Sequence, residues 1–183
     1  MSANEIRIIG GRWRGRKLRF PGAQGLRPTP DRVRETLFNW LGQDLTGLRT
    51  LDPFAGSGAL SLEALSRGAA HAVAVDRQRD LVRALTETAA SLGATSLEIH
   101  CADALAFIAR ERRSFDVIFL DPPFGDTVWD DLLAAAAARL APAGSLYVEA
   151  PCPIEAPPGL AIWRRDKAGQ VHYHLLRHVG DTA

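Results

Sequence analysis

Cysteine is scarce in this sequence, with only Cys101 and Cys152 among 183 residues. The two are not spaced like metal ligands, and each lies in or beside an apolar, strand-like segment where a free thiol behaves as a small hydrophobic group. No apolar run is long enough to span a membrane, and the amino terminus lacks the apolar core of a signal peptide. We therefore expect a cytoplasmic protein that binds no metal and whose cysteines carry no chemistry.

Internal repeats and low-complexity linkers are also missing, and the length suits one domain with a small appendage. The hydrophobic fraction of 46% and the charged fraction of 23% exclude a disordered or fibrous chain. We predict that residues 1–30 form a basic extension and that residues 31–183 form the main domain.

Charge is unevenly distributed along the chain. Residues 1–40 contain nine basic and three acidic side chains, a net charge of +6, so the total of +1 leaves −5 for the remainder. The basic ones are Arg7, Arg12, Arg14, Arg16, Lys17, Arg19, Arg27, Arg32 and Arg34. Because Trp13 and Phe20 are interleaved with them, the arm favours phosphate contact combined with base stacking. The alternative is a solvated charged surface.

Short apolar runs alternate with helical stretches beyond the basic arm. Strands are predicted at about 49–52, 72–76, 97–101, 116–120 and 145–149. Helices are predicted at about 31–41, 58–67, 79–92, 104–112 and 129–140. This alternation is typical of a mostly parallel sheet with helices on both faces.

Both ends of this pattern have their own signals. Thr29 is predicted to cap the helix at 31–41, with Pro30 in its first turn and Gly42 at its end. In the tail, two extended runs meet around residues 167–169 and predict an antiparallel β-hairpin. His172 and His174, which have no carboxylate or cysteine at metal spacing, are interpreted as packing or surface residues.

The segment TLDPFAGSGALSLEAL, residues 50–65, follows the first predicted strand and opens a helix. Gly56 and Gly58 allow a tight turn and close approach to a ligand at the positive end of that helix. Ser61 replaces the third glycine of a dinucleotide fingerprint, and the loop lacks the lysine of a phosphate-binding loop. A carboxylate at Asp52 would repel pyrophosphate and attract an ammonium group.

A second loop, in FDVIFLDPPFG at residues 115–125, ends a buried strand with an acid. Pro122 and Pro123 have no backbone N–H to donate, and they bias the preceding residues toward extended geometry. The carbonyls of Asp121 and Pro122 are therefore aimed in a fixed direction. Taken alone, the tripeptide is equally compatible with an ordinary strand-ending loop.

With these two loops the chain resembles the class I S-adenosylmethionine-dependent methyltransferases, which implies a Rossmann-like fold with a seven-stranded sheet. The resemblance implies that DPFAGSG wraps the methionine part of the cofactor. It also implies that Asp76 and Arg77 lie at the ribose, and that Asp103 lies at the adenine amino group with Ala104 and Leu105 beside the ring. The cofactor loop comprises Asp52, Pro53, Phe54, Ala55, Gly56, Ser57 and Gly58. Asp103 is also a good candidate for the N-cap of the next helix.

In this superfamily, an acid, two prolines and an aromatic residue after the fourth strand mark enzymes that methylate a nitrogen conjugated to a planar system. Asp121 and the Pro122 carbonyl, with Pro123 shaping the loop, would accept the two amino hydrogens, and Phe124 would stack on an extruded base. The motif does not choose between adenine in DNA, guanine in RNA and a glutamine side chain.

The segment RIIGGRWRGRKLRFPGAQGLRPTPDRVRETLFNWL, residues 7–41, is similar to the start of the bacterial 16S rRNA guanine-N2 methyltransferases. The similarity implies methylation of guanine 966, S-adenosylmethionine as cofactor, and 16S rRNA as partner, within an assembled or assembling 30S subunit. It places Thr29 over cofactor and target. We assign all the basic residues named above except Arg32 to RNA contact, with Arg34 exposed at a helix start, and we expect a monomer.

Three other functions fit parts of the sequence. A DNA adenine-N6 methyltransferase would need a target-recognition domain, for which 183 residues leave no room. A nicotinamide-dependent dehydrogenase is disfavoured by Asp52 and by the missing third glycine. A non-catalytic RNA-binding module would not need the motif from Asp121 to Phe124.

Overall fold

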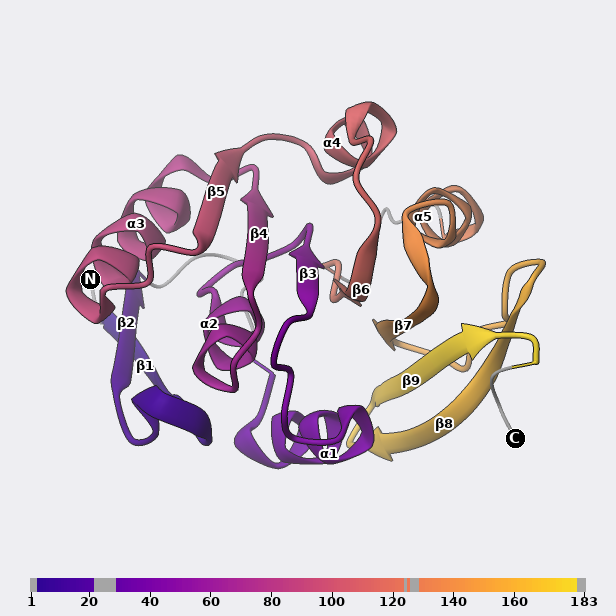
Figure 1. The fold of residues 1–183 in the computed structure, drawn as a ribbon, viewed down its shortest axis with the longest axis horizontal. Helices are drawn as coiled ribbons and strands as arrows, with labels where there is room; N and C mark the ends of the chain where they lie inside the picture. Colours follow the sequence, from indigo (N-terminus) through magenta and orange to yellow (C-terminus); the bar gives the residue numbers. More distant parts are fainter. Residues whose placement is uncertain (1–2, 22–28, 124, 126–128, 181–183) are drawn as a thin grey trace.

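The computed structural model describes residues 3–21, 29–123, 125 and 129–180. A seven-stranded sheet runs through its centre in the order β5-β4-β3-β6-β7-β9-β8 (Figure 1). The strands are β3 (Arg49–Asp52), β4 (His71–Asp76), β5 (Leu97–Cys101), β6 (Phe115–Leu120), β7 (Leu140–Ala150), β8 (Leu160–Ala168) and β9 (Val171–His178). The first five pair in parallel, and β9 pairs antiparallel with both β7 and β8. The predicted sheet and its antiparallel end are confirmed.

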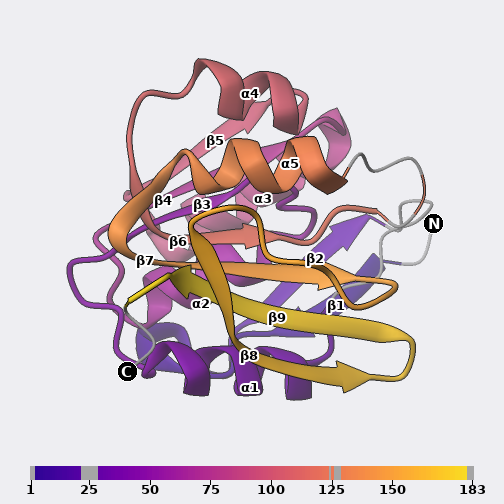
Figure 2. The same ribbon diagram turned by 90° about the vertical axis from the view of Figure 1, so that its right-hand side faces the viewer.

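Helices cover both faces of this sheet. The helices α1 (Asp31–Leu41), α2 (Ala59–Ser66) and α3 (Arg79–Leu92) pack on one face, and α4 (Ala104–Arg110) and α5 (Trp129–Ala137) pack on the other. In Figure 2, α4 and α5 lie above the sheet and α1 and α2 below it. Successive side chains of a strand point to opposite faces, so Phe119 joins the first core and Ile118 and Leu120 join the second.

The helix α1 has the predicted bounds, and it ends at Gly42 with φ of 96°, the left-handed conformation that glycine adopts without strain. Its N-cap, however, is Pro30, which makes no side-chain capping bond. The prediction that Thr29 caps this helix is wrong, because the Thr29 hydroxyl is directed to acidic side chains described below. The alternative for Asp103 is confirmed, since its Oδ1 accepts a hydrogen bond from the Ala106 amide at 2.9 Å as the cap of α4.

The basic arm folds as a two-stranded antiparallel sheet of β1 (Ala3–Arg7) and β2 (Lys17–Pro21), with a short 3-10 helix, η1 (Gly11–Trp13), in the connection. This N-terminal hairpin sits on the end of α2. The Glu63 carboxylate accepts hydrogen bonds from the backbone amides of Ile9 at 2.9 Å and Gly10 at 2.7 Å. Ser66 Oγ accepts one from the backbone amide of Trp13 at 2.9 Å. At Gly11, with φ of 72°, a Cβ would lie 1.8 Å from the Ser66 carbonyl oxygen, so only glycine fits.

The C-terminal hairpin of β8 and β9 brings its tip to the same edge of the sheet as the end of β7. The register aligns Ala150 with His172, and His172 with Lys167. In Figure 2 the arrowheads of β7 and β8 point to the same side. His174 is buried and its ring stacks on that of His172 at 6.5 Å between centroids.

The cysteines differ from the expectation that they behave as small hydrophobic groups in apolar segments. Cys101 and Cys152 are both free and exposed, because Cys101 ends an edge strand and Cys152 follows the end of β7. Within the described residues, none of the helices combines the length and apolar character that a membrane crossing needs.

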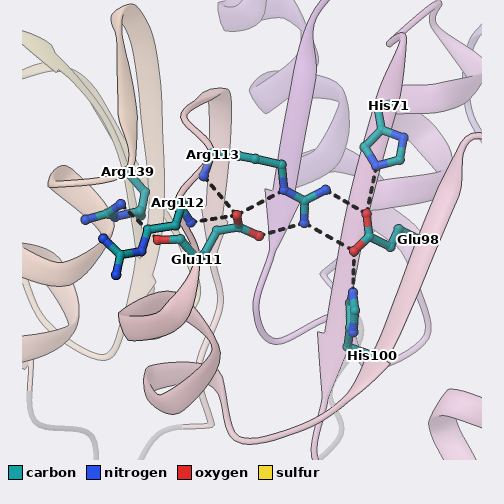
Figure 3. Close-up of polar contacts among 7 residues, drawn as sticks. All are labelled: His71, Glu98, His100, Glu111, Arg112, Arg113 and Arg139. Atoms are coloured by element: carbon teal, nitrogen blue, oxygen red, sulfur yellow. Dashed lines mark hydrogen bonds and ion pairs between the residues drawn. The ribbon is translucent and has the colours of Figure 1, made fainter.

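A polar network holds the outer strands β4 and β5 to the segment before β6 (Figure 3). Arg113 donates to both carboxylate oxygens of Glu98, at 2.7 and 3.1 Å, and to both oxygens of Glu111, at 2.6 to 3.0 Å. Glu98 also contacts the ring nitrogens of His71 and His100. The network therefore fixes β5, whose carboxyl end leads to Asp103.

Candidate active site

Acidic residues end three strands on the same edge of the sheet. Asp52 ends β3, Asp76 ends β4, and Asp121 directly follows β6. After β3 the chain builds β4 and β5 on one side and then crosses to β6 on the other, so β3 and β6 flank the point where the winding direction reverses. In open α/β sheets, ligands bind outside the carboxyl ends of the strands at such a point.

The glycine loop between β3 and α2 is closely packed. Gly56 and Gly58 have φ of 51° and 75°, and a Cβ on Gly58 would lie 2.2 Å from Leu85 Cδ1. The Ala55 amide donates to the Val75 carbonyl at 2.9 Å, and the Gly56 amide donates to Asp76 Oδ2 at 2.9 Å. The loop is thereby held against β4, and the first turn of α2 faces the strand ends.

Asp52 is buried at the base of this loop and is incompletely bonded. Ser61 Oγ donates to its Oδ2 at 2.9 Å, whereas Oδ1 has no hydrogen-bond partner among the described residues. Burial, together with the nearby charge of Asp76, raises the pKa of Asp52 to about 7 although the Ser61 hydrogen bond acts in the opposite direction. A cationic hydrogen-bond donor at Oδ1 would stabilise the charged form.

The next two strand ends have free acceptor capacity and apolar surface. Asp76 accepts the amides of Gly56 and Gln78, and a carboxylate has about four acceptor positions, so two hydroxyl donors can still bind. Beyond β5, Ala104 is buried while Leu105 is 38% exposed, unusual for a large hydrophobic residue in this protein. These features suit a ribose and a planar ring. Arg77 and Asp103 are exposed beside them.

Asp121 meets buried polar groups from β7 and from Thr29, which precedes α1. The Thr29 hydroxyl lies 3.3 Å from Asp121 Oδ2 and 2.9 Å from Glu149 Oε1, and the Tyr147 hydroxyl donates to Glu149 Oε1 at 2.8 Å. Burial, and then the charges of Glu149 and Asp52, raise the pKa of Asp121 well above its usual value. Burial also raises the pKa of Glu149. Among the described residues, the side-chain donors to Asp121 and Glu149 are two hydroxyls, those of Thr29 and Tyr147.

The proline loop is described only in part. Pro122 is buried and Pro123 is exposed. Phe124, predicted to stack on a base, and Arg27, predicted to contact RNA, lie outside the described residues. The cofactor-loop residues Pro53, Phe54 and Ser57 follow Asp52 in the loop between β3 and α2.

Sequence reasoning missed three residues of this site. Glu149 ends the strand predicted at 145–149 and is the penultimate residue of β7, so the rule that marked Asp52, Asp76 and Asp121 would have found it. Tyr147 is two residues earlier on the same face. Ser61 was read only as a missing glycine, but its hydroxyl holds Asp52.

The N-terminal hairpin presents most of its basic side chains to solvent. Those exposed are Arg7, Arg12, Arg14, Arg16, Lys17 and Arg19. Trp13 and Phe20, expected to stack on bases, are only 9% and 3% exposed, because they pack into the interior under the hairpin. That stacking expectation is wrong. The Arg12 guanidinium instead covers the outer face of Trp13, 4.0 Å from the ring centroid.

Arg34 also departs from its prediction. Its side chain is completely buried, and it donates to the backbone carbonyls of Thr29 at 3.3 Å and Arg7 at 2.9 Å. It pairs with Glu63 at 3.5 Å and hydrogen-bonds Asp31. The expectation of an exposed Arg34 is therefore wrong. This residue of α1 connects the hairpin to α2, and it is not part of the exposed basic surface.

Comparison with known proteins identifies the family to which the chain belongs. A family model described as "Conserved hypothetical protein 95" matches residues 6–177. The chain is 42% identical over 180 residues to "Ribosomal RNA small subunit methyltransferase D" of Escherichia coli strain K12, covering 96% of this chain and 91% of the relative. It is 36% identical over 182 residues to the Haemophilus influenzae protein of the same name, covering 95% and 94%.

A solved structure agrees with this relationship. "Putative methyltransferase yhhF from Escherichia coli" superposes with a TM-score of 0.88 at 41% identity, covering 96% of this chain and 98% of that one. The predicted Rossmann-like class I methyltransferase fold is therefore confirmed.

Proposed function

The chain belongs to the family of the small-subunit ribosomal RNA methyltransferases D, and on this premise we propose that it methylates the exocyclic N2 amino group of one guanine in 16S rRNA. Methyl transfer to rRNA follows from the family. The choice of the N2 position and of guanine 966 is our inference from resemblance and from the acid at the end of β6. The observation that carries it is Asp121 at the reversal point of the sheet, beside the glycine loop and the Asp52 oxygen that has no hydrogen-bond partner in the described part of the chain.

The cofactor-binding residues fit S-adenosylmethionine. Asp52 Oδ1 would accept a hydrogen bond from the ammonium group in the methionine part of the cofactor. Asp76 would accept hydrogen bonds from the ribose hydroxyls, and Ala104 and Leu105 would flank the adenine. When bound, the cofactor supplies a methyl group on a positively charged sulfur. The positive φ angles of Gly56 and Gly58 shape the loop that leads into α2, whose positive amino end would lie beside the ligand.

Asp121 and Pro122 would prepare the amino group for attack. The lone pair of an exocyclic amino nitrogen is delocalised into the base, which makes it a poor nucleophile. Accepting its two hydrogens, at the Asp121 carboxylate and the Pro122 carbonyl, localises the lone pair and stabilises the developing positive charge. We assign base stacking to Phe124 and shaping of the loop to Pro123, and the base is extruded from its helix to reach them.

The exposed face of the N-terminal hairpin is the proposed RNA surface, with residues 1–30 as its functional unit and Arg27 as a further contact. Arg12 and Arg14 border a wide depression of about 890 Å³ between the hairpin and the ends of α1 and α2. A second depression, lined by Arg16, Lys17 and Arg19, separates β2 from α3. Such a basic surface suits the backbone of a folded RNA within a 30S particle. We propose that the protein acts as a cytoplasmic monomer.

The test is transfer of a labelled methyl group to 30S particles, naked 16S rRNA and duplex DNA, followed by identification of the modified nucleoside. We expect N2-methylguanosine in 16S rRNA. Asp121→Ala should keep the fold and lower single-turnover transfer by about 100-fold, the scale of one preorganised electrostatic contact. Asp131→Ala, at an exposed position of α5, is the matched control. Methylated adenine in DNA, or undiminished transfer by Asp121→Ala, would refute the proposal.

A further inference from the structure

One hydroxyl group stands between two carboxyl groups in the active site. Thr29 Oγ1 is 2.9 Å from Glu149 Oε1 and 3.3 Å from Asp121 Oδ2, and a threonine hydroxyl has a single hydrogen to donate. If Glu149 and Asp121 were both ionised, one of them would face a lone pair of the hydroxyl oxygen. The contacts are satisfied together when one carboxyl group carries a proton and donates it to Thr29.

The surroundings also favour a single shared proton. Among the described residues, Asp52 from β3 acts on Asp121, Tyr147 from β7 acts on Glu149, Tyr173 from β9 acts on Tyr147, and Asp76 acts on Asp52. None of these groups is a cation, the guanidinium of Arg34 bonds the backbone carbonyl of Thr29, and Glu149 is 4% exposed. Two carboxylates that contact the same hydroxyl in a buried site repel each other, which disfavours ionisation of both. Burial and the charge of Glu149 raise the pKa of Tyr147, so its hydroxyl stays protonated as a donor.

We propose that Glu149 and Thr29 are positioning residues that share one proton with Asp121. They take up this proton when the substrate binds, so that Asp121 faces the substrate as a carboxylate. This inference rests on the proposed function, because it assigns the partners of the residue that receives the amino group. Neither residue needs to touch the reacting atoms. They act through the hydroxyl of Thr29, whose main chain is held by Arg34.

Two arrangements of the proton follow from the geometry. In the free site, Tyr147 and Thr29 both donate to Glu149, which is the carboxylate, and Asp121 is protonated and donates to Thr29. When the amino group of the base donates a hydrogen bond to Asp121, it stabilises the carboxylate form of Asp121 over the protonated form. Asp121 then gives its proton to the Thr29 oxygen while Thr29 passes its own hydrogen to Glu149. The number of protons in the pair is unchanged.

The proton released by the reaction is accounted for separately. The amino lone pair forms the new bond to the methyl carbon, and the pair of the broken carbon–sulfur bond returns to sulfur, leaving a positive charge on nitrogen. That nitrogen loses one proton to Asp121. Asp121 is only half-buried, so it releases the proton to water once the methylated base has left.

Substitutions at the two positions should move the titration of Asp121 in the free protein in opposite directions. Glu149→Gln removes the charge that raises the pKa of Asp121, so Asp121 should titrate at lower pH. Thr29→Val removes the hydroxyl that bonds Asp121 while keeping the shape, so Asp121 should titrate at higher pH, and turnover at neutral pH should be lower by about 10-fold or more. Thr29→Ser should restore most of that loss.

Glu155→Gln, an exposed glutamate in the connection between β7 and β8, is the control for loss of one carboxylate. Superimposable titrations of Asp121 in wild type, Glu149→Gln and Thr29→Val would overturn the inference. Equal losses in Thr29→Ser and Thr29→Val would overturn it as well, because the hydroxyl would then not matter.

A measurement without RNA or cofactor separates this inference from the proposed function. The carboxyl carbon of Asp121, assigned by its loss in Asp121→Asn, can be titrated by NMR in the free protein. We expect it to titrate at lower pH in Glu149→Gln than in wild type. An unchanged titration refutes the shared proton even if the enzyme methylates rRNA. A shifted titration supports it even if methylation is found on another substrate.

Discussion

Arg34 and Glu63 form an ion pair inside the protein, with 3.5 Å between Nη1 and Oε2 and neither side chain exposed to solvent. Glu63 also binds two backbone amides of the N-terminal hairpin, and Arg34 binds the carbonyl of Thr29, whose hydroxyl contacts Asp121. The pair therefore connects the proposed RNA surface to the candidate active site through groups that are fixed by burial.

Breaking this pair should destabilise the whole protein. In Glu63→Gln the neutral amide cannot balance the buried guanidinium of Arg34, and loss of one partner of such a pair costs about 3–5 kcal/mol. We expect the free energy of unfolding in urea to fall by that amount. Glu87→Gln, an exposed change on α3, should alter it by less than about 0.5 kcal/mol. Equal effects of the two substitutions would show that Arg34 finds other partners.

The hairpin arginines should govern the salt dependence of RNA binding. Replacing Arg12, Arg14 and Arg16 with glutamine removes three exposed cations, so the slope of log affinity against log salt should become shallower by about two to three. Cofactor affinity should be retained, since these residues are on the far end of α2 from the glycine loop. Fluorescence anisotropy with a 16S rRNA fragment measures the slope.

The control for that experiment is an equal change of charge elsewhere. Arg83, Arg110 and Arg112 are exposed on α3, at the end of α4 and just after it. Their replacement with glutamine should reduce the slope less than the hairpin substitutions. A slope that depends only on total charge would assign the hairpin to solvated surface.

Cofactor affinity should depend on pH through Asp52. Its pKa is raised to about 7, so the carboxylate that would bind an ammonium group is lost as the pH falls through that value. We expect S-adenosylmethionine to bind more weakly below pH 7, approaching a tenfold change per pH unit well below it. Calorimetry from pH 5.5 to 8.5 measures this, and Asp52→Asn should bind weakly at every pH. A flat wild-type profile would place the ammonium group elsewhere.

The Glu98 network should contribute stability only above acidic pH. Hydrogen bonds from Arg113 hold the pKa of Glu98 well below its usual value of 4.5, so the stabilisation is present above pH 4.5 and is lost as the pH falls through the lower value in the folded protein. Glu98 is partly exposed, so we expect Glu98→Gln to cost about 1 kcal/mol at pH 7. Urea unfolding from pH 3 to 7 should show the difference from wild type shrinking in acid. A constant difference would contradict this account.

Local chemistry determined much of the protein without its tertiary structure. The bounds of α1 and α3 match their predictions because apolar periodicity and a terminal glycine act over a few residues. Acids at the ends of apolar runs identified Asp52, Asp76 and Asp121 because the carboxyl ends of parallel strands meet at one edge. These features depend on neighbours in sequence and on a single rule of sheet topology.

Burial and long-range pairing decided the rest. Arg34, Trp13 and Phe20 carry the sequence signals of an RNA-binding arm, but the interior that covers them is built largely from α1, α2 and α3. The hydroxyl of Thr29, next to a helix start, bonds Glu149 across 120 residues of sequence instead of capping that helix. A hydroxyl has one hydrogen to donate, and which acceptor receives it is set by the fold that brings a carboxylate within 3 Å, because an unpaired buried acid costs more than an open helix cap.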